Sequence, residues 1–260
     1  MQVTILSSGA NRRTSLVLDD LTAALKQQGA NVTQLHPLDC ASDAPLPDAD
    51  VVVLKNKSQS GLALGKRFHL KGVPTISPYP ATELCRNKLA TSHILAEAGL
   101  PVPESRTIRR PADVQQLLSK GPVVVKPVRG SRGRGIMVLD GPGDMPELGD
   151  EEVFVQRYYK PDGLDLKIYR IGPEYFCVER TWPPRTLQEK LGRLVELDNE
   201  IRDIAQACGE AVGCTVYGVD IIKHDGRPWI VDMSSFPGFK GVPQAGYRLA
   251  QVVMQARSQR

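Results

Sequence analysis

The sequence predicts an α/β protein with a small doubly wound lobe at its start and a strand-rich remainder. Over residues 1–80, short β-branched runs alternate with a helical pattern. From about residue 120 to 180 the pattern is mostly strands, and the final part mixes helices with a strand pair. We therefore expect an α/β lobe over 1–80 and a second domain over 81–260.

The first lobe has the β–α–β alternation of a parallel sheet. Apolar runs of strand length occupy Val3–Leu6, Val51–Leu54 and Gly72–Ile76. Thr14–Gln28 has a helical pattern between the first two runs, with Thr14 able to cap the helix and Gly29 able to end it. We expect these strands to pair in parallel.

A boundary follows the first lobe. Thr82–Ala98 has a helical pattern that ends at Gly99, and Pro101 and Pro103 lie just beyond it. A short helix near Ala112–Leu118 comes next. We then expect strands at Val123–Lys126, Ile136–Leu139, Val153–Gln156, Leu166–Ile171 and Tyr175–Glu179.

The last third begins with an amphipathic helix. Apolar side chains recur on one face of Leu197–Val212, and Asp198 can cap this helix. The chain continues with strands at Val216–Ile222 and Trp229–Met233, a glycine-rich loop and a helix from about Ala245. Pro183–Arg193, which is polar and basic after two prolines, is the strongest candidate for a mobile loop.

Composition excludes several classes of protein. Charged residues make up 24% and hydrophobic residues 41% of the chain, as in ordinary globular proteins. The net charge of +4 comes from 33 basic residues interleaved with 29 acids, so we expect no nucleic-acid partner. We find no signal peptide and no apolar run approaching about 18 residues, so we expect no membrane partner. Five widely spaced cysteines without a C-x-x-C pair indicate reduced thiols and a cytoplasmic protein.

Asp225-Gly226 is a strong hairpin signal between two strands that carry aspartates. The length of the loop sets which residues face each other. A three-residue loop, Asp225–Arg227, places Asp220 opposite Asp232 with Ser234 on the same face, whereas a two-residue loop separates the aspartates. We favour the three-residue loop, which brings the carboxylates about 4.5–5.5 Å apart at Cβ and suits Mg²⁺ between them. The alternative is a pair of exposed acids on an ordinary hairpin.

A glycine-rich loop follows the strand that ends in Lys126. Its sequence, Gly130-Ser-Arg-Gly-Arg-Gly135, lies between two expected strands. It lacks the Walker A pattern, and no helix opens after it as a Rossmann fingerprint requires. A strand–glycine loop–strand unit can fold its backbone N–H groups over phosphate oxygens, although such loops are also simple turns. Because an apolar strand delivers Lys126 beside the loop, we favour phosphate binding.

In their order and spacing these motifs resemble the ATP-grasp superfamily, most closely its RimK-like branch of carboxylate–amine ligases. The resemblance runs from about Leu84 to Val242. It rests on Arg86-Asn87-Lys88, Gly-Leu-Pro-Val-Pro, Val-Val-Lys126-Pro with its glycine loop, Gln156–Asp165, and Ser-Phe-Pro-Gly-Phe-Lys-Gly. It implies an ATP-grasp fold in which 1–80 form the N-terminal lobe, about 120–160 a lid and about 161–260 the metal-binding lobe.

The resemblance also implies the cofactors ATP and Mg²⁺, with one or two ions and with Mn²⁺ able to substitute. The nucleotide would be bound by Lys88 and Lys126, by the loop residues Gly130, Ser131, Arg132 and Gly133, and by the hinge residues Gln156, Arg157, Tyr158 and Asp165. The metal positions would be Asp220, Asp232 and Ser234. Lys167 and Arg180 would lie near the transferred phosphate as catalytic residues.

The implied reaction is an ATP-dependent ligation of a carboxylate to an amine through an acyl phosphate, with release of ADP and phosphate. Its partners would be small-molecule carboxylates and amines, and a homo-oligomer stays open. Two positions depart from the ligase pattern, because Asp232 stands where glutamate is usual and Ser234 where asparagine is usual. Asp232-Met-Ser-Ser-Phe-Pro-Gly is also similar to the inositol phosphate kinases of the superfamily. The alternative is therefore a kinase acting on a polyol such as an inositol phosphate.

Overall fold

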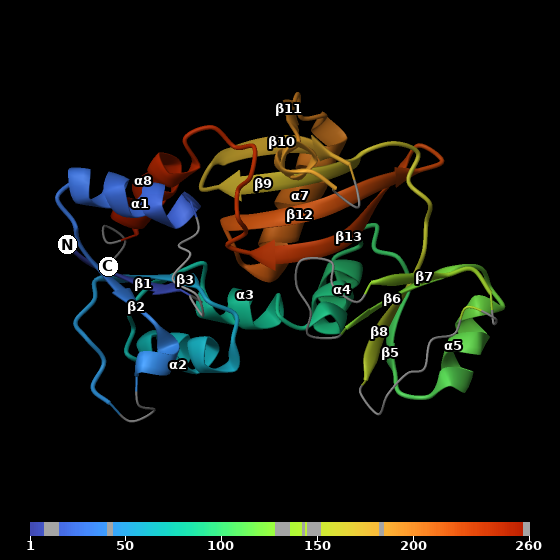
Figure 1. The fold of residues 1–260 in the computed structure, drawn as a ribbon, viewed down its shortest axis with the longest axis horizontal. Helices are drawn as coiled ribbons and strands as arrows, with labels where there is room; N and C mark the ends of the chain where they lie inside the picture. Colours follow the sequence, from blue (N-terminus) through green and yellow to red (C-terminus); the bar gives the residue numbers. More distant parts are fainter. Residues whose placement is uncertain are drawn as a thin grey trace.

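The protein is built from three β-sheets with helices packed around them (Figure 1). This computed structural model describes residues 1–7, 16–40, 44–127, 136–141, 144, 152–181 and 185–256. The four positions of the glycine-rich loop expected to bind the nucleotide, Gly130, Ser131, Arg132 and Gly133, lie outside the described residues. Within these ranges no helix is both long enough and apolar enough to span a membrane.

The first sheet is parallel, as the β–α–β alternation predicts. Its strands are β1 (Gln2–Ser7), β2 (Asn31–Leu35), β3 (Val51–Lys55) and β4 (Thr75–Ile76), in the order β2-β1-β3-β4. Helix α1 (Leu16–Gln27), helix α2 (Gln59–Leu70) and a single 3₁₀ turn, η1 (Pro37–Asp39), accompany them. The sequence pattern missed β2 because it is an edge strand whose residues are all at least partly exposed.

Helix α2 was missed because two glycines interrupt its helical pattern. Close packing excludes a side chain at the first and leaves little room for one at the second. A Cβ at Gly61 would lie 2.4 Å from the Asn56 side chain, and one at Gly65 would lie 3.1 Å from Leu54. Local propensity was therefore overridden by the contact between α2 and the end of β3.

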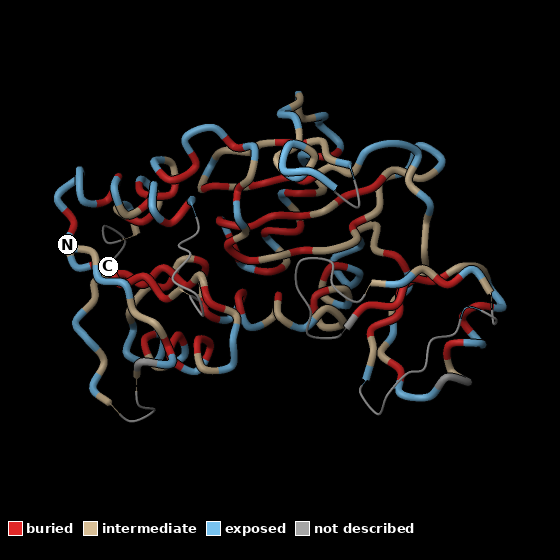
Figure 2. Tube along the Cα trace, in the orientation of Figure 1, coloured by how far each residue is buried: buried red, intermediate tan, exposed pale blue. Residues whose placement is uncertain are grey.

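The C-terminal helix α8 (Ala245–Gln255) completes the first lobe by packing against α1 (Figure 1). Gly246 permits this approach, since a Cβ there would lie 2.4 Å from Asp20. The main apolar core is accordingly continuous between the two ends of the chain and includes Ile5, Leu21, Ile171, Phe236 and Leu249. Figure 2 shows these buried segments running through the strands, with exposed residues on the outer helices.

The single helix expected over Thr82–Ala98 is two helices, α3 (Tyr79–Leu84) and α4 (Lys88–Glu97). Asn87 begins the second one, because its side chain accepts a hydrogen bond from the Ala90 N–H at 3.1 Å. The break places Lys88 in the first turn of α4. From there the Lys88 side chain reaches the third sheet, which is described below.

The second sheet is small and antiparallel. It contains β5 (Ser105–Ile108), β6 (Val123–Pro127), β7 (Met137–Leu139) and β8 (Val153–Arg157), in the order β5-β8-β6-β7. Helix α5 (Pro111–Leu118) supplies Val114, Leu117 and Leu118 to a separate apolar core beneath these strands. The sheet forms a lobe of its own, at the right in Figure 1. Strand β5 was not predicted.

The third sheet carries most of the predicted site residues. Its strands are β9 (Asp165–Ile171), β10 (Glu174–Arg180), β11 (Arg193–Val195), β12 (Val216–His224) and β13 (Arg227–Ser235), in the order β11-β10-β9-β12-β13. Helix α7 (Asn199–Val212), capped by Asp198 as predicted, covers one face with Ile201, Ala205 and Cys208.

The segment expected to be a mobile loop is structured where it is described. It contains helix α6 (Leu187–Leu191), which has a capping box between Thr186 and Glu189, and the start of β11. Pro183 and Pro184 lie outside the described residues. The prediction missed the Thr-x-x-Glu signal, so the described part of the loop is corrected to a helix and a strand.

Candidate active site

Strands β12 and β13 pair so that Asp220 lies opposite Asp232, as predicted, but the loop is different. His224 pairs with Arg227, which leaves Asp225 and Gly226 as a two-residue turn with φ of 50° and 72°. The register then shifts between Asp220 and Ile221 at a β-bulge that gives β13 one extra residue. The three-residue loop was therefore wrong, and the bulge turns Asp232 to the face of Asp220.

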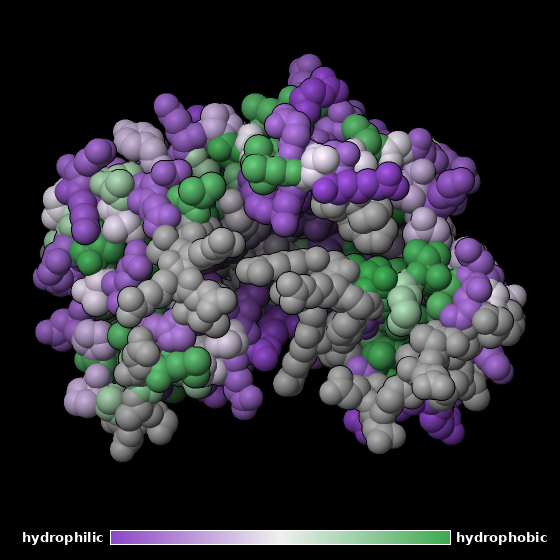
Figure 3. Space-filling view, in the orientation of Figure 1, coloured by the Kyte–Doolittle hydropathy of each residue, from purple (hydrophilic) through white to green (hydrophobic). Residues whose placement is uncertain are grey.

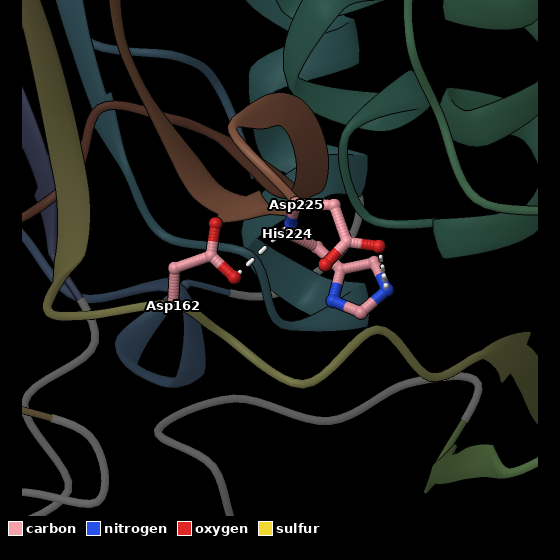
Figure 4. Close-up of side chains that lie close together, drawn as sticks. All are labelled: Asp162, His224 and Asp225. Atoms are coloured by element: carbon pink, nitrogen blue, oxygen red, sulfur yellow. Dashed lines mark hydrogen bonds and ion pairs between the residues drawn. The ribbon is translucent and has the colours of Figure 1, made fainter.

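The turn is held by an acidic residue from another segment (Figure 4). Asp162 accepts hydrogen bonds from the N–H groups of Asp225 (3.0 Å) and Gly226 (2.9 Å), and these bonds lower the pKa of Asp162. His224 Nδ1 lies 2.9 Å from the Lys160 carbonyl oxygen. Asp162, His224 and Asp225 lie close enough to share a cation. Because both Asp162 oxygens are already paired with backbone, we interpret the group as a brace that fixes the hairpin register.

The sheet register aligns charged residues in one row across three strands. Lys167 on β9 pairs with Asp220 on β12, and Asp220 pairs with Asp232 on β13. Asp220 forms two ion pairs, one at 2.8 Å with Lys167 Nζ and one at 2.8 Å with Arg180 Nη2. Arg180 is the last residue of β10. Lys167 is buried, so its ammonium is paired with this carboxylate rather than hydrated by bulk water. The geometry joins both predicted catalytic residues to one predicted metal ligand.

Asp232 is paired with the lysine that α4 supplies. Lys88 Nζ lies 2.9 Å from Asp232 Oδ1. Burial raises the pKa of Asp232, but Lys88, Lys167 and Lys126 outweigh it and hold the pKa at about 2. Asp232 is therefore ionised throughout the physiological range. A small cavity lined by Lys88, Phe154 and Asp232 lies beside this pair, between α4, β8 and β13.

Lys126 approaches from the second sheet. Its ammonium donates hydrogen bonds to Gln156 Oε1 at 2.8 Å and to the Val231 carbonyl oxygen at 3.1 Å. Gln156 is itself oriented by a bond from its Nε2 to Ser105 Oγ at 3.1 Å. Lys126 is 8% exposed, and burial lowers its pKa to about 8. The site thus joins a buried cation from the second sheet to the acids of the third.

Asp165 lies on the same strand as Lys167 and on the same face. It pairs with Arg180 across β9 and β10. Burial raises the pKa of Asp165 to about 6, and the nearby Asp220 carboxylate raises it too, while Arg180 lowers it. The fold therefore keeps a carboxylate where its charge is costly, as binding sites often do.

We expect Asp165→Asn to stabilise the protein without nucleotide and to weaken ATP binding. The folded pKa of about 6 lies above the reference value of 3.8. Between these pH values the folded protein retains a proton that the unfolded chain has released, so stability falls as pH rises. At pH 7.5 the variant should gain about 1–2 kcal/mol, after allowance for solvent screening. Below pH 4 the gain should vanish.

Thermal unfolding at pH 3.5 and 7.5, with nucleotide titration at pH 7.5, tests this expectation. The exposed Asp48→Asn is the matched control, because it removes one carboxylate that lies in no predicted site. An Asp165→Asn protein that is no more stable than this control at pH 7.5 would contradict the role of burial.

The other predicted site residues, Ser234, Arg157 and Tyr158, make no hydrogen bond or ion pair with Asp220 or Asp232 in the part of the chain that the structure describes. Ser234 pairs with Gly218 and lies two residues from Asp232 on the same strand, hence on the same face. The Arg157 guanidinium donates to the carbonyl oxygens of Gly121, Pro122 and Leu117, away from the aspartates. The Arg157 N–H donates to the Glu104 carbonyl, and the Tyr158 N–H donates to the Pro122 carbonyl. These two N–H groups are therefore already bonded within the protein.

Two lysines near the site were not predicted. Lys55, at the end of β3, donates to the carbonyl oxygens of Phe236 (2.6 Å) and Pro237 (2.8 Å). It ties the first lobe to the glycine-rich loop after β13. Lys57 lies within electrostatic range of Asp232, Lys88 and Lys167. Neither lysine lies in a motif, so only the juxtaposition of the first and third sheets reveals them.

The oxygen ligands and cationic side chains of the site suit a nucleotide bound together with a hard cation. Two carboxylates and a hydroxyl project from adjacent positions of one hairpin, and oxygen ligands of this kind are what Mg²⁺ prefers. These acids are surrounded by four cationic side chains, those of Lys88, Lys126, Lys167 and Arg180. Hydrophilic side chains also gather around the hollow at the middle of the molecule (Figure 3). The Nε of Arg180 is buried with no hydrogen-bond partner among the described residues.

Comparison with known proteins identifies the family. Residues 85–256 match the model of the RimK-like ATP-grasp domain. The chain belongs to the RimK-like ATP-grasp family. A probable alpha-L-glutamate ligase of Shewanella amazonensis is 24% identical over an alignment 280 residues long, gaps included. The alignment covers 94% of this chain and 91% of that protein.

Solved structures agree in fold. A RimK-domain ATP-grasp protein from Sphaerobacter thermophilus superimposes with a TM-score of 0.79 at 17% identity, covering 98% of this chain and 100% of that one. The ATP-grasp ligase PsnB, solved with minimal precursor, Mg and ADP, gives 0.75 at 16% identity, covering 98% and 97%. The predicted ATP-grasp fold is confirmed, and the chain is an ATP-grasp enzyme of the ligase type. The comparisons give no support to the kinase alternative.

Proposed function

We propose that this RimK-like ATP-grasp ligase joins a small-molecule or peptide carboxylate to an amine, at the site centred on Asp220 and Asp232. The observation that supports this most directly is the row Lys167–Asp220–Asp232, flanked by Lys88 and Arg180. It places two adjacent acids between cations on one sheet face, as a site for polyphosphate and metal requires. The name of the Shewanella relative makes L-glutamate the first amine to test.

The proposed reaction has two steps. A carboxylate oxygen attacks the γ-phosphorus of ATP, the bond to the bridging oxygen breaks, and ADP leaves with an acyl phosphate remaining. The amine nitrogen then attacks the carbonyl carbon, phosphate leaves with its electron pair, and the nitrogen loses a proton. Asp220, Asp232 and Ser234 would hold one or two Mg²⁺ ions, or Mn²⁺, which would neutralise phosphate charge.

The side chains of this chain would share the work of binding and charge neutralisation. Lys88 and Lys126 would bind the α- and β-phosphates. Lys88 is held beside Asp232, and Lys126 is held beside Gln156. Lys167 and Arg180 would face the transferred phosphoryl group, where their charges offset charge on the departing oxygens. Asp165 would accept a hydrogen bond from the ribose. The loop Gly130–Gly133 would close over the phosphates.

We propose the domain boundaries 1–80 and 81–260, with the lid at about 120–160 and the metal-binding lobe at about 161–260, of which the last helix, α8, packs against the first lobe. We also infer a cytoplasmic location and no nucleic-acid or membrane partner. ATP as substrate and five cysteines that form no disulfide support this location.

The test is a search for the acyl phosphate. The protein is incubated with Mg²⁺, ATP, hydroxylamine and a pool of small carboxylates, amino acids and dipeptides, and hydroxamates are identified by mass spectrometry. Hydroxylamine replaces the unknown amine, so the first step is detected without knowing the second substrate. Replacing hydroxylamine with L-glutamate should then give an amide and one ADP per product. ADP release with phosphate transferred to an alcohol would overturn the ligase in favour of a kinase.

A further inference from the structure

Lys55 is the side chain through which the first lobe reaches the loop after β13. Its ammonium donates hydrogen bonds to the carbonyl oxygens of Phe236 at 2.6 Å and Pro237 at 2.8 Å. It also lies 5.4 Å from the centre of the Phe236 ring, within the range of a cation–π contact. Hydrogen bonds from an ammonium are stronger than those between neutral groups. Two adjacent carbonyls of the loop are therefore held by one lysine at the end of β3.

The backbone of this loop is strained. Phe236 and Phe239 have φ of 40° and 46°, a region that bulky residues rarely adopt. Both side chains are 2% exposed in the main core, and their rings meet edge-on with centroids 5.7 Å apart. Strained backbone persists where surrounding contacts enforce it, and it clusters at functional sites. The core enforces this conformation through the two rings, and Lys55 enforces it through the carbonyls.

Pro237 carries the effect of Lys55 to the face of the site. Gly218 lies two residues before Asp220 on β12, so the two residues face the same side of the sheet. A Cβ at Gly218 would lie 3.0 Å from Pro237 Cγ and 2.9 Å from Lys167 Cε. The proline ring and the lysine chain therefore share the space that a glycine leaves open at this position.

The placement of Lys167 matters for the proposed chemistry. Its ammonium would face the transferred phosphoryl group, where a displacement of about 1 Å can cost about 100-fold in rate. Asp220 positions the Nζ at 2.8 Å, and Pro237 flanks the end of the side chain over Gly218. Pro237 is in turn held by Lys55. The first lobe is thus connected through a single proline to a residue that the proposed reaction uses.

We propose that Lys55 is a positioning residue, which seats Pro237 over Gly218 and thereby confines Lys167 to its place against Asp220. The inference rests on the proposed ligase function, in which Lys167 acts on the transferred phosphate. It gives the first lobe a role in the rate of phosphoryl transfer and leaves nucleotide binding to other residues.

The first test compares Lys55→Met, Lys55→Arg and the wild type in the hydroxamate assay, with the carboxylate that the wild type uses best. Lys55→Met should lower kcat by about 10- to 100-fold, because a misplaced Lys167 weakens stabilisation of the transition state. The KM for ATP should change by less than about threefold, since Lys88 and Lys126 are untouched. Lys55→Arg can still donate to both carbonyls and should recover part of the loss. Lys66→Met, at an exposed position of α2, is the matched control.

A double-mutant cycle determines whether Lys55 acts through Lys167. In a Lys167→Met background, Lys55→Met should lower kcat by less than about a further threefold, because the side chain that it positions is already gone. Equal losses in the two backgrounds would overturn the proposal. So would a lower melting temperature with an unchanged kcat, which would make Lys55 a structural contact only. If Lys55→Met melts more than about 5 °C below the Lys66→Met control, Lys55→Gln, which keeps an uncharged donor, replaces it in the cycle.

A measurement without turnover separates this proposal from the ligase function. If the wild type forms no hydroxamate, the ligase function fails, and the NMR signal of the Lys167 side chain decides the role of Lys55. In protein isotopically labelled at lysine Cε, this signal is assigned as the one missing from Lys167→Met. Lys55→Met should shift it, and Lys66→Met should leave it in place. A Lys167 signal that does not move in Lys55→Met would overturn the positioning role.

Discussion

Asp232→Asn should lower kcat/KM by about 10³-fold or more, which corresponds to roughly 4 kcal/mol of transition-state stabilisation. Asp232 lies opposite Asp220 across the hairpin and is the acid that Lys88 contacts. An amide oxygen keeps the shape of the side chain but removes the charge that a metal and a phosphate-binding lysine both require. The measurement is steady-state ADP release as a function of Mg²⁺ concentration. The variant should need much more Mg²⁺ for its residual activity.

Asp225→Asn is the matched control for this change, since it makes the same substitution on the same hairpin at an exposed position. Asparagine also tolerates the positive φ of 50° found there. The control should retain wild-type activity. If Asp232→Asn stays within tenfold of the control, Asp232 is not a metal ligand and the proposed site is wrong.

Lys126→Met should raise the KM for ATP by about 100-fold, because the proposed nucleotide site loses a buried charged donor. The same change should raise the melting temperature without nucleotide. Burial holds the pKa of Lys126 at about 8, below the reference value of 10.5, so the charged form costs about 3 kcal/mol at pH 7. The lost bonds to Gln156 and Val231 offset about 1–2 kcal/mol of that gain. We expect an increase of about 2–4 °C.

The pH dependence of this gain supplies a separate check. Between pH 8 and 10.5 the folded protein has released the Lys126 proton and the unfolded chain still holds it. Wild-type stability therefore rises with pH in this window relative to Lys126→Met, and the difference between the two should shrink by pH 10. The exposed Lys120→Met controls for loss of one charge. A variant that is destabilised at pH 7 by more than this control would contradict the cost assigned to burial.

Lys126, Asp220 and Asp232 could be selected from the sequence because each lies in a motif that combines strand pattern with residue chemistry. The α/β class and most of the strands were predictable for the same reason, since apolar periodicity reports which face of an element is buried. The elements that were missed are those in which packing overrides local preference. Helix α2 contains Gly61 because the Asn56 side chain occupies the space of a Cβ, and β2 is an exposed edge.

The fold class, the identity of the paired aspartates and the lysine of the second sheet could all be read from the amino-acid sequence. How the aspartates meet depends on the folded structure, through a bulge in β13 that no turn signal encodes. The folded structure also decided that Lys55, from a segment without a motif, reaches the loop after β13 and donates to the carbonyl oxygens of Phe236 and Pro237. The physical reason is the same in both cases. Periodicity and turn chemistry act over a few neighbouring residues, whereas register and the approach of separate lobes depend on contacts between residues far apart in the chain.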